Sequence, residues 1–194
     1  MDKKEVIAFF DRLAPSWDGE LITDDDIINR IFDYAGIQAG ISVLDVACGT
    51  GVLFPFYLRR NVSSITGVDI STAMIEIAGK KFNDPRIQLI NADMETVALS
   101  ASFDCCMIYN AFPHFENTKQ LITNLAAQLV KGCRLTIAHS MSRKSLDAHH
   151  KGTASKVSNG LIHEDELAAL LEPYFQVNVK ISNESLYVVS GSKK

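Results

Sequence analysis

No stretch of this 194-residue sequence is apolar over the roughly 20 residues that a transmembrane helix requires. Its polar first residues, MDKKE, lack the basic and then apolar order of a signal peptide, so we expect a cytoplasmic protein that does not enter a membrane. Lysines and arginines nowhere form a run longer than a pair, and 19 basic against 23 acidic residues give a net charge of −4. This charge balance disfavours a nucleic-acid partner.

The four cysteines form no C-x-x-C pair and show no spacing typical of a zinc site. A cytosolic setting also disfavours disulfides, so three cysteines are interpreted as small apolar strand residues, and only Cys48 falls in a loop of interest. Four of the five histidines, His139, His149, His150 and His163, lie late in the chain, but their spacing fits no metal site. We therefore predict no bound metal.

Internal repeats, low-complexity tracts and linkers are also missing, and the composition, with 47% hydrophobic and 22% charged residues, is that of an ordinary globular protein. At 194 residues the chain is somewhat longer than a typical single domain. We therefore expect one domain over residues 1–194 that builds its own core.

Short apolar runs alternate with helical patterns along most of the chain. Two amphipathic helices are predicted first, over Lys3–Leu13 and over Thr23–Ala35. The runs that follow predict strands at Ser42–Val46, Ser63–Ile70, Ile87–Ile90, Phe103–Tyr109 and Arg134–His139, and helices at Gly51–Arg60, Ser71–Phe82 and Thr118–Leu129. Continuous apolar strands separated by helices indicate a parallel sheet covered on both faces, so the predicted fold class is α/β, doubly wound and Rossmann-like.

The last part of the sequence breaks this alternation. After a helix predicted at Glu164–Leu171, two apolar runs, Phe175–Ile181 and Ser185–Gly191, are joined only by a short turn at Asn183-Glu184. Strands joined so briefly must be antiparallel.

A glycine-rich loop follows the first predicted strand in the segment VLDVACGTGVL. Small residues at Ala47, Gly49 and Gly51 let the main chain turn tightly and approach a ligand, and the N–H groups of the next helix offer donors. Pro55 lies in that helix and is tolerated only in its first turn, so the helix is predicted to start near Gly51 or Val52. In a doubly wound sheet this loop lies at the switch point, where ligands bind.

An acid ends the second predicted strand. Asp69 stands 18 residues after Gly51, a spacing from which a carboxylate can bind both hydroxyls of an adenosine ribose. The alternative is that the glycines form only a tight turn and that Asp69 caps the helix at Ser71. A nicotinamide or flavin fingerprint asks for a third glycine where this chain has Phe54, a side chain expected to keep helix and strand apart. Asp45, just before the loop, could receive the ammonium group of an amino-acid ligand.

These segments resemble the motifs of the class I S-adenosylmethionine-dependent methyltransferases, and the resemblance covers nearly the whole chain. The first motif of that family is an acid followed by small-x-Gly-x-Gly, with glycine often at the first small position. The residues that match it here are Asp45, Ala47, Gly49 and Gly51. The resemblance implies S-adenosylmethionine as the cofactor.

The later motifs imply roles for further residues. GVDIS is similar to the second motif and implies that Asp69 binds the ribose and Ile70 packs on the adenine. NADMET resembles the third and implies that Asp93 accepts the adenine amino group while Met94 lies against the ring. FDCCMIYNAFPHF resembles the fourth, a strand whose end at Tyr109-Asn110 opens toward the methyl group.

The resemblance also implies the topology and a lid. The family's seven strands are ordered 3-2-1-4-5-7-6 with the seventh antiparallel, which agrees with the predicted hairpin. FFDRLAPSWD resembles the N-terminal lid of members that act on small molecules, including the ubiquinone and menaquinone branch. Residues 1–36 are therefore expected to form a helical lid that brings Trp17 over the cofactor.

Methyl transfer from a sulfonium depends more on the alignment of the acceptor with the methyl group and on the exclusion of water than on a catalytic group. Where the acceptor must lose a proton, histidine is a common base, and His114 and His139 both follow predicted strands at the carboxyl edge of the sheet. Either could instead cap a strand or bond a loop. Residues 140–160, with His149 and His150, exceed a minimal connection, and insertions there commonly line the substrate pocket in this family.

The sequence thus predicts methyl transfer from S-adenosylmethionine to a small-molecule acceptor by in-line displacement. One alternative is an RNA or protein acceptor, although Asn110-Ala-Phe-Pro departs from the Asn-Pro-Pro-aromatic motif of adenine-modifying members. An NAD(P)-dependent reductase and a non-catalytic S-adenosylmethionine-binding protein are two others. The acceptor atom, the use of a general base and the oligomeric state stay open.

Overall fold

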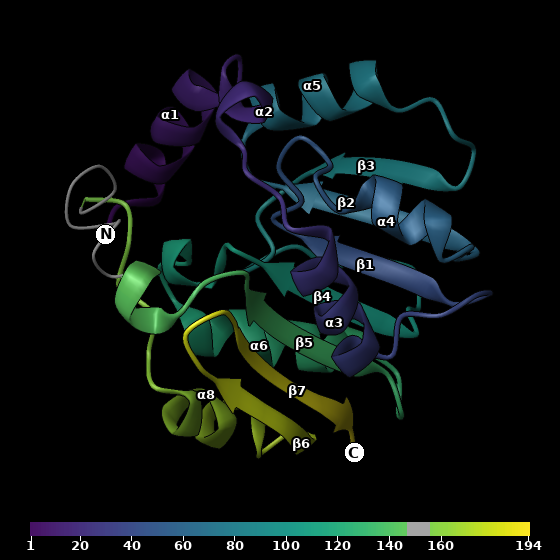
Figure 1. Cartoon of the computed structure of the whole chain (residues 1–194), viewed down its shortest axis with the longest axis vertical. Coiled ribbons are helices and arrows are strands. Elements are labelled where there is room, and N and C mark those ends of the chain that lie inside the picture. Colours follow the sequence, from purple (N-terminus) through teal and green to yellow (C-terminus); the bar gives the residue numbers. More distant parts are fainter. Residues whose placement is uncertain (147–155) are drawn as a thin grey trace.

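The computed structural model describes residues 1–146 and 156–194 (Figure 1). In this part of the chain a seven-stranded sheet has the order β3-β2-β1-β4-β5-β7-β6. The strands are β1 (Ser42–Val46), β2 (Ser64–Asp69), β3 (Ile87–Asn91), β4 (Cys105–Tyr109), β5 (Arg134–His139), β6 (Phe175–Ser182) and β7 (Tyr187–Lys193). The first five strands pair in parallel, and β7 runs antiparallel to β5 and β6. The predicted fold class and strand order are confirmed.

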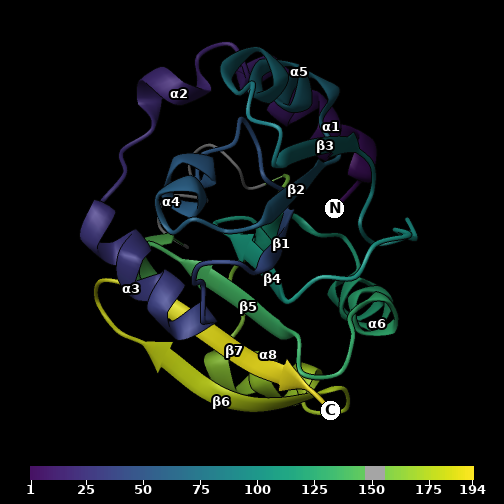
Figure 2. The ribbon, with the colours of Figure 1, turned by 90° about the vertical axis from the view of Figure 1, so that its right-hand side faces the viewer.

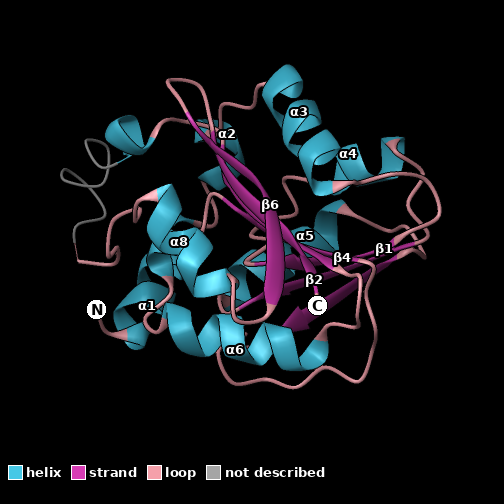
Figure 3. Ribbon diagram, turned by 90° about the horizontal axis from the view of Figure 1, so that it is seen from below, coloured by secondary structure: helices cyan, strands magenta, loops and turns pink. Residues whose placement is uncertain are grey.

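Helices cover both faces of the sheet (Figure 3). The helices are α1 (Lys3–Leu13), α2 (Trp17–Glu20), α3 (Asp25–Ala35), α4 (Phe54–Arg59), α5 (Thr72–Lys81), α6 (Thr118–Gln128) and α8 (Glu164–Leu171). On one face α3, α4 and α5 pack in a core that includes Val43 of β1, and on the other α6 and α8 pack in a core that includes Leu44. Because both of these neighbouring residues are fully buried, the strand is apolar throughout rather than alternating.

Most helix boundaries follow their sequence signals. The carboxylate of Asp24 accepts hydrogen bonds from two N–H groups at the start of α3, and Gly36 ends this helix in the left-handed region with φ 70°. The helix α4 differs from the prediction, since it starts at Phe54 rather than near Gly51, after a series of turns. Pro55 nevertheless lies in its first turn, as predicted.

The first two helices lie beside α5 rather than within the layers that cover the sheet (Figures 1 and 2). The helix α3 instead packs its buried Ile28, Ile31 and Phe32 into the core. The segment 1–36 therefore comprises a peripheral part, α1 and α2, and a core helix. Within the described ranges, no helix has the length and apolar character needed to cross a membrane.

Candidate functional site

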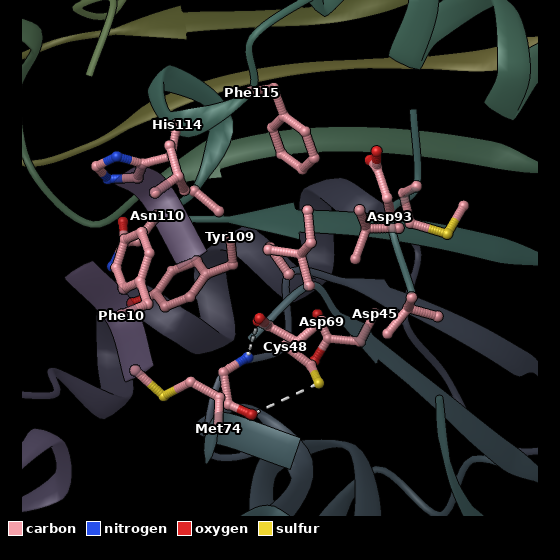
Figure 4. A pocket seen from close by; sticks show the side chains of 18 of the residues that line it. Phe10, Asp45, Cys48, Asp69, Met74, Asp93, Tyr109, Asn110, His114 and Phe115 are labelled. Atoms are coloured by element: carbon pink, nitrogen blue, oxygen red, sulfur yellow. Dashed lines mark hydrogen bonds between the residues drawn. The ribbon is translucent and has the colours of Figure 1, made fainter. Parts of the chain in front are cut away.

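A cavity beside the ends of β1, β2 and β4 brings most of the predicted site residues together (Figure 4). Its empty space, which includes space open to solvent, is about 1130 Å³. The predicted cofactor residues that line it are Asp45, Ala47, Gly49, Asp69, Ile70, Asp93, Met94, Asn110 and Trp17. His114 also lines it, whereas Gly51 and His139 are not among its lining residues.

The glycine loop follows β1 with a left-handed backbone at alternate residues. Ala47, Gly49 and Gly51 have φ values of 57°, 57° and 82°. A Cβ on Gly51 would lie 2.6 Å from Phe54 and 2.7 Å from Phe82, so only glycine fits there. No atom lies within 4 Å of the same position on Gly49. Gly51 therefore permits the packing behind the loop, whereas Gly49 leaves the main chain open to a ligand in the cavity.

The ring of Phe54 does not hold α4 away from the sheet, contrary to the expectation from sequence. Phe54 is fully buried, and its Cζ would lie 2.7 Å from a Cβ placed on Gly67 of β2. The missing side chain of Gly67 makes room for the ring against the strand. Position 54 thus accommodates the ring, and the lack of a third glycine still counts against a nicotinamide or flavin ligand.

Asp69 ends β2 with both carboxylate oxygens bound to backbone N–H groups. Its Oδ2 accepts from Gly49 at 2.8 Å, and its Oδ1 accepts from Ser71 at 2.8 Å. Burial raises the pKa of Asp69, although the two N–H donors favour the charged form. The hydroxyl of Ser71 accepts from Met74 N–H at 3.2 Å, so Ser71 rather than Asp69 caps α5. Asp69 is left to face the cavity.

Asp45 lies next to Asp69 and carries an oxygen that no described residue satisfies (Figure 4). The side chain is almost completely buried, at 2% exposure, and it lines the cavity. Burial and the neighbouring charge of Asp69 raise the pKa of Asp45 well above its ordinary value. A buried carboxylate with an unused acceptor is complementary to a cationic ligand group.

Asp93 follows β3 and is held by two groups, one of which sequence reasoning missed. Its Oδ1 accepts from Glu95 N–H at 2.9 Å, and its Oδ2 accepts from the ammonium of Lys3 at 2.6 Å. Lys3 also donates to Glu95 Oε2 at 2.7 Å. Burial lowers the pKa of Lys3, but its bonds to the two carboxylates outweigh this effect and leave the pKa raised. No local motif links residues 3 and 93.

The other end of the cavity is lined by aromatic side chains and by His114 (Figure 4). His114 ends a short 3₁₀ helix, and its Nδ1 lies 2.7 Å from the carbonyl oxygen of Val157. Because a carbonyl only accepts, Nδ1 carries the proton in the neutral ring and Nε2 carries the lone pair. The ring also packs edge-on against Phe10, with centroids 5.0 Å apart. The aromatic residues at this end are Phe10, Trp17, Tyr109 and Phe115.

Asn110 joins two strand ends at this part of the cavity. Its backbone is left-handed, with φ 53°. Its amide nitrogen donates to Ser140 Oγ at 3.0 Å, and its amide oxygen accepts from Ser140 N–H at 2.9 Å. Asn110 thus ties the end of β4 to the end of β5 and shapes the cavity wall.

Two other described histidines, His139 and His163, are not among the lining residues of the cavity. His139 is fully buried and packs edge-on near Tyr187, with ring centroids 6.1 Å apart. Its predicted role beside an acceptor stays a prediction. Its complete burial favours the alternative that His139 caps a strand or bonds a loop. His163 caps α8. His149 and His150, with the middle of the 140–160 segment, lie outside the described residues. Over the described ranges, no group of three or more His, Cys, Asp or Glu side chains could hold a metal ion.

Known methyltransferases match this chain in sequence. Residues 43–132, which contain the glycine loop, match a protein family described as "Methyltransferase domain". The chain is 28% identical over 132 residues to a malonyl-[acyl-carrier protein] O-methyltransferase of Acetivibrio thermocellus, covering 66% of this chain and 47% of that protein. It is 24% identical over 161 residues to the ubiquinone/menaquinone biosynthesis C-methyltransferase UbiE of Campylobacter jejuni. This match covers 74% of this chain and 67% of that protein. The chain spans about half the length of curated relatives such as the first.

Solved methyltransferase structures share the fold. Magnesium protoporphyrin IX methyltransferase from Synechocystis PCC 6803, with bound S-adenosylhomocysteine, superposes with a TM-score of 0.74 at 16% identity and covers 100% of both chains. A second structure is the N-methyltransferase NodS from Bradyrhizobium japonicum, also with S-adenosylhomocysteine. It superposes with a TM-score of 0.71 at 14% identity and covers 97% of this chain and 98% of NodS. In its sheet order, its glycine loop and these matches, the chain is similar to the class I S-adenosylmethionine-dependent methyltransferases.

Proposed function

We propose that this protein transfers a methyl group from S-adenosylmethionine to a small molecule. The observation that carries the proposal is a single cavity that joins two sets of residues. The glycine loop, Asp69 and Asp93 offer groups for an adenosyl amino acid. The aromatic end with His114 offers a site for an acceptor.

The residues around the glycine loop fit this cofactor. Asp69 retains lone pairs beyond its two N–H bonds, and these can accept from ribose hydroxyls. Ile70 and Met94 offer apolar contacts for adenine, and Asp93 offers an acceptor for its amino group. The unsatisfied oxygen of Asp45 suits an ammonium group. When bound, S-adenosylmethionine supplies an electrophilic methyl group on a sulfonium, so the transfer itself needs no further reactive group from the protein.

His114 is the side chain we propose as general base where the acceptor carries a hydroxyl or ammonium proton. The bond from its Nδ1 to the Val157 carbonyl fixes the tautomer and the ring orientation. Its Nε2 then has the lone pair that takes up a proton. The aromatic side chains around it make this end of the cavity apolar.

A small molecule is the acceptor that the cavity supports. The one lysine among the described lining residues, Lys3, is bound to two carboxylates, and no arginine lines the cavity there. A polynucleotide acceptor would need basic side chains for its phosphates. The relatives are named for malonyl-[acyl-carrier protein] and for ubiquinone and menaquinone biosynthesis, and one structural neighbour is named for magnesium protoporphyrin IX. The names that refer to quinones and to a porphyrin are consistent with a small-molecule acceptor.

We also propose that the protein works in a reducing, cytoplasmic setting. All four cysteines are buried, and none forms a disulfide. Burial raises the pKa of the Cys48 thiol, so this cysteine stays protonated and unreactive beside the cavity.

Calorimetry with S-adenosylmethionine and S-adenosylhomocysteine tests the proposal. We expect both to bind with one site per chain, and labelled cofactor to pass its methyl group to the small-molecule fraction of a cell extract. No binding at millimolar concentration by folded protein would refute the proposed function. Binding without transfer to any acceptor fraction would instead favour the non-catalytic alternative.

A further inference from the structure

The two N-terminal helices bind each of the three loops that we expect to contact the cofactor. These loops follow β1, β2 and β3. The first contains Gly49, the second begins directly after Asp69, and the third contains Asp93. One polar side chain of the α1–α2 segment reaches each loop. The three side chains are Lys3, Asp11 and Asp18, and we call them the clamp.

Asp18 of α2 binds the glycine loop. Its Oδ1 accepts from the hydroxyl of Thr50 at 2.6 Å, and its Oδ2 accepts from the ammonium of Lys81 at 2.7 Å. Thr50 is completely buried and stands between Gly49 and Gly51. The bond therefore fixes the middle of the loop from the side of the N-terminal helices.

Asp11 of α1 binds the start of α5, directly after the proposed ribose carboxylate. Its Oδ1 accepts from Ser71 Oγ at 2.5 Å and from Ala73 N–H at 3.2 Å. The N–H of Ser71 donates in turn to Asp69. Asp11 is thus two hydrogen bonds away from Asp69.

Lys3 at the start of α1 binds the proposed adenine acceptor directly. Its ammonium bridges Asp93 and Glu95 at 2.6 Å and 2.7 Å. The carboxylate of Glu95 is almost fully buried, and its other oxygen accepts from Asn117 N–H at 2.8 Å. Lys3 therefore separates two like charges and sets the orientation of Asp93.

The same helices also form a wall of the cavity. Val6 and Phe10 of α1, Trp17 of α2 and Leu21, which directly follows α2, line it. Movement of this segment would open the cavity and break the three clamp contacts together. Its return would restore the bonds to all three loops.

We propose that Lys3, Asp11 and Asp18 are positioning residues that close α1 and α2 over bound cofactor and set how long it stays. This inference rests on the proposed function, because it assumes that the loops bind S-adenosylmethionine. Each contact is partly exposed, so the loss of one contact alone should change the release rate of the cofactor less than about fivefold. Because the three contacts hold the same segment, the loss of all three is expected to accelerate release of the bound cofactor roughly 10- to 100-fold.

The test compares release of S-adenosylhomocysteine by stopped flow from the wild type, from Asp18→Ala and from the triple variant Lys3→Gln, Asp11→Asn, Asp18→Ala. The matched control is Asp165→Ala, which breaks an exposed pair with Lys180 on α8 and β6, away from the cavity. We expect release about threefold faster from Asp18→Ala and at least tenfold faster from the triple variant. The control should release at the wild-type rate, and KM for S-adenosylmethionine should rise more than kcat falls.

Two results would overturn the clamp. One is a triple variant that releases the ligand at the wild-type rate, and the other is a control that is accelerated equally. Hydrogen exchange of residues 3–20 without ligand separates this inference from the proposed function. Faster exchange there in the triple variant shows that the three contacts hold the segment in place, a result that does not depend on cofactor binding, and unchanged exchange contradicts the clamp.

Discussion

The carboxylate of Asp69 accepts a hydrogen bond from the backbone N–H of Gly49 at 2.8 Å. The acid at the end of β2 and the glycine loop after β1 are therefore parts of one bonded unit, although 20 residues separate them. A second bond, from Ser71 N–H, fixes the other oxygen of the same carboxylate. Asp69 is thus placed to shape the loop and to bind a ligand beside it.

Asp69→Asn should weaken both the fold and the binding of S-adenosylmethionine. One carboxylate oxygen becomes an NH₂ group that faces an N–H donor, so we expect a loss of about 1–3 kcal/mol in the free energy of unfolding. We expect cofactor binding to weaken by about 1.5–3 kcal/mol, because ribose hydroxyls lose a charged acceptor. Urea unfolding and calorimetry measure the two effects.

Asp104→Asn is the matched control for that variant. Asp104 also accepts two hydrogen bonds, from the N–H and the hydroxyl of Ser42, but it does not line the cavity. Its substitution should weaken the fold and leave cofactor affinity unchanged. If Asp69→Asn bound cofactor as tightly as this control does, Asp69 would not bind the ribose.

Asp45→Asn should stabilise the ligand-free protein and weaken cofactor binding. The pKa of Asp45 is raised in the folded state, so the folded protein holds a proton that the unfolded chain releases near pH 4. The wild type therefore loses stability as pH rises from about 4 through the raised pKa, by up to about 1.4 kcal/mol per pH unit. The variant does not titrate at this position, so its stability advantage should grow across that range and then level off.

Thermal unfolding from pH 4 to 8 measures this difference, and calorimetry at pH 8 measures the cofactor affinity. If the stabilities of the two proteins changed in parallel with pH, the environment of Asp45 would not raise its pKa. Unchanged affinity would show that its carboxylate does not receive the ammonium group.

His114→Asn should lower turnover and leave cofactor affinity nearly unchanged. The amide nitrogen of asparagine can replace Nδ1 as donor to the Val157 carbonyl, but nothing replaces the lone pair of Nε2. For an acceptor that must lose a proton we expect kcat to fall by about 10²- to 10⁴-fold. Steady-state kinetics with His163→Asn as the control checks this, and a kcat within twofold of wild type would remove His114 as the base.

The fold was largely predictable because its signals are local. The apolar run of β1 has buried neighbours on both faces of the sheet, so the run itself indicates a covered parallel strand. The start of α4 was predicted too early because the turns after Gly51 leave no mark in the pattern. The four-residue helix α2 is too short for periodicity to reveal.

The candidate site was predictable only where its residues belong to motifs. The motif residues Asp45, Asp69 and Asp93 line one cavity because the ends of parallel strands meet at one edge of the sheet. The contact of Lys3 with Asp93 joins residues 90 apart and depends on how α1 packs, which no short spacing encodes. The room that Gly67 gives to Phe54 was missed for the same reason.

A crystal structure with S-adenosylhomocysteine is the most direct test of where the cofactor binds. We predict that the adenosyl group lies between residues 46–52 and Asp69, with the ribose hydroxyls within hydrogen-bond distance of that carboxylate. A cavity filled by the protein's own side chains, or a ligand bound away from the glycine loop, would contradict the assignment.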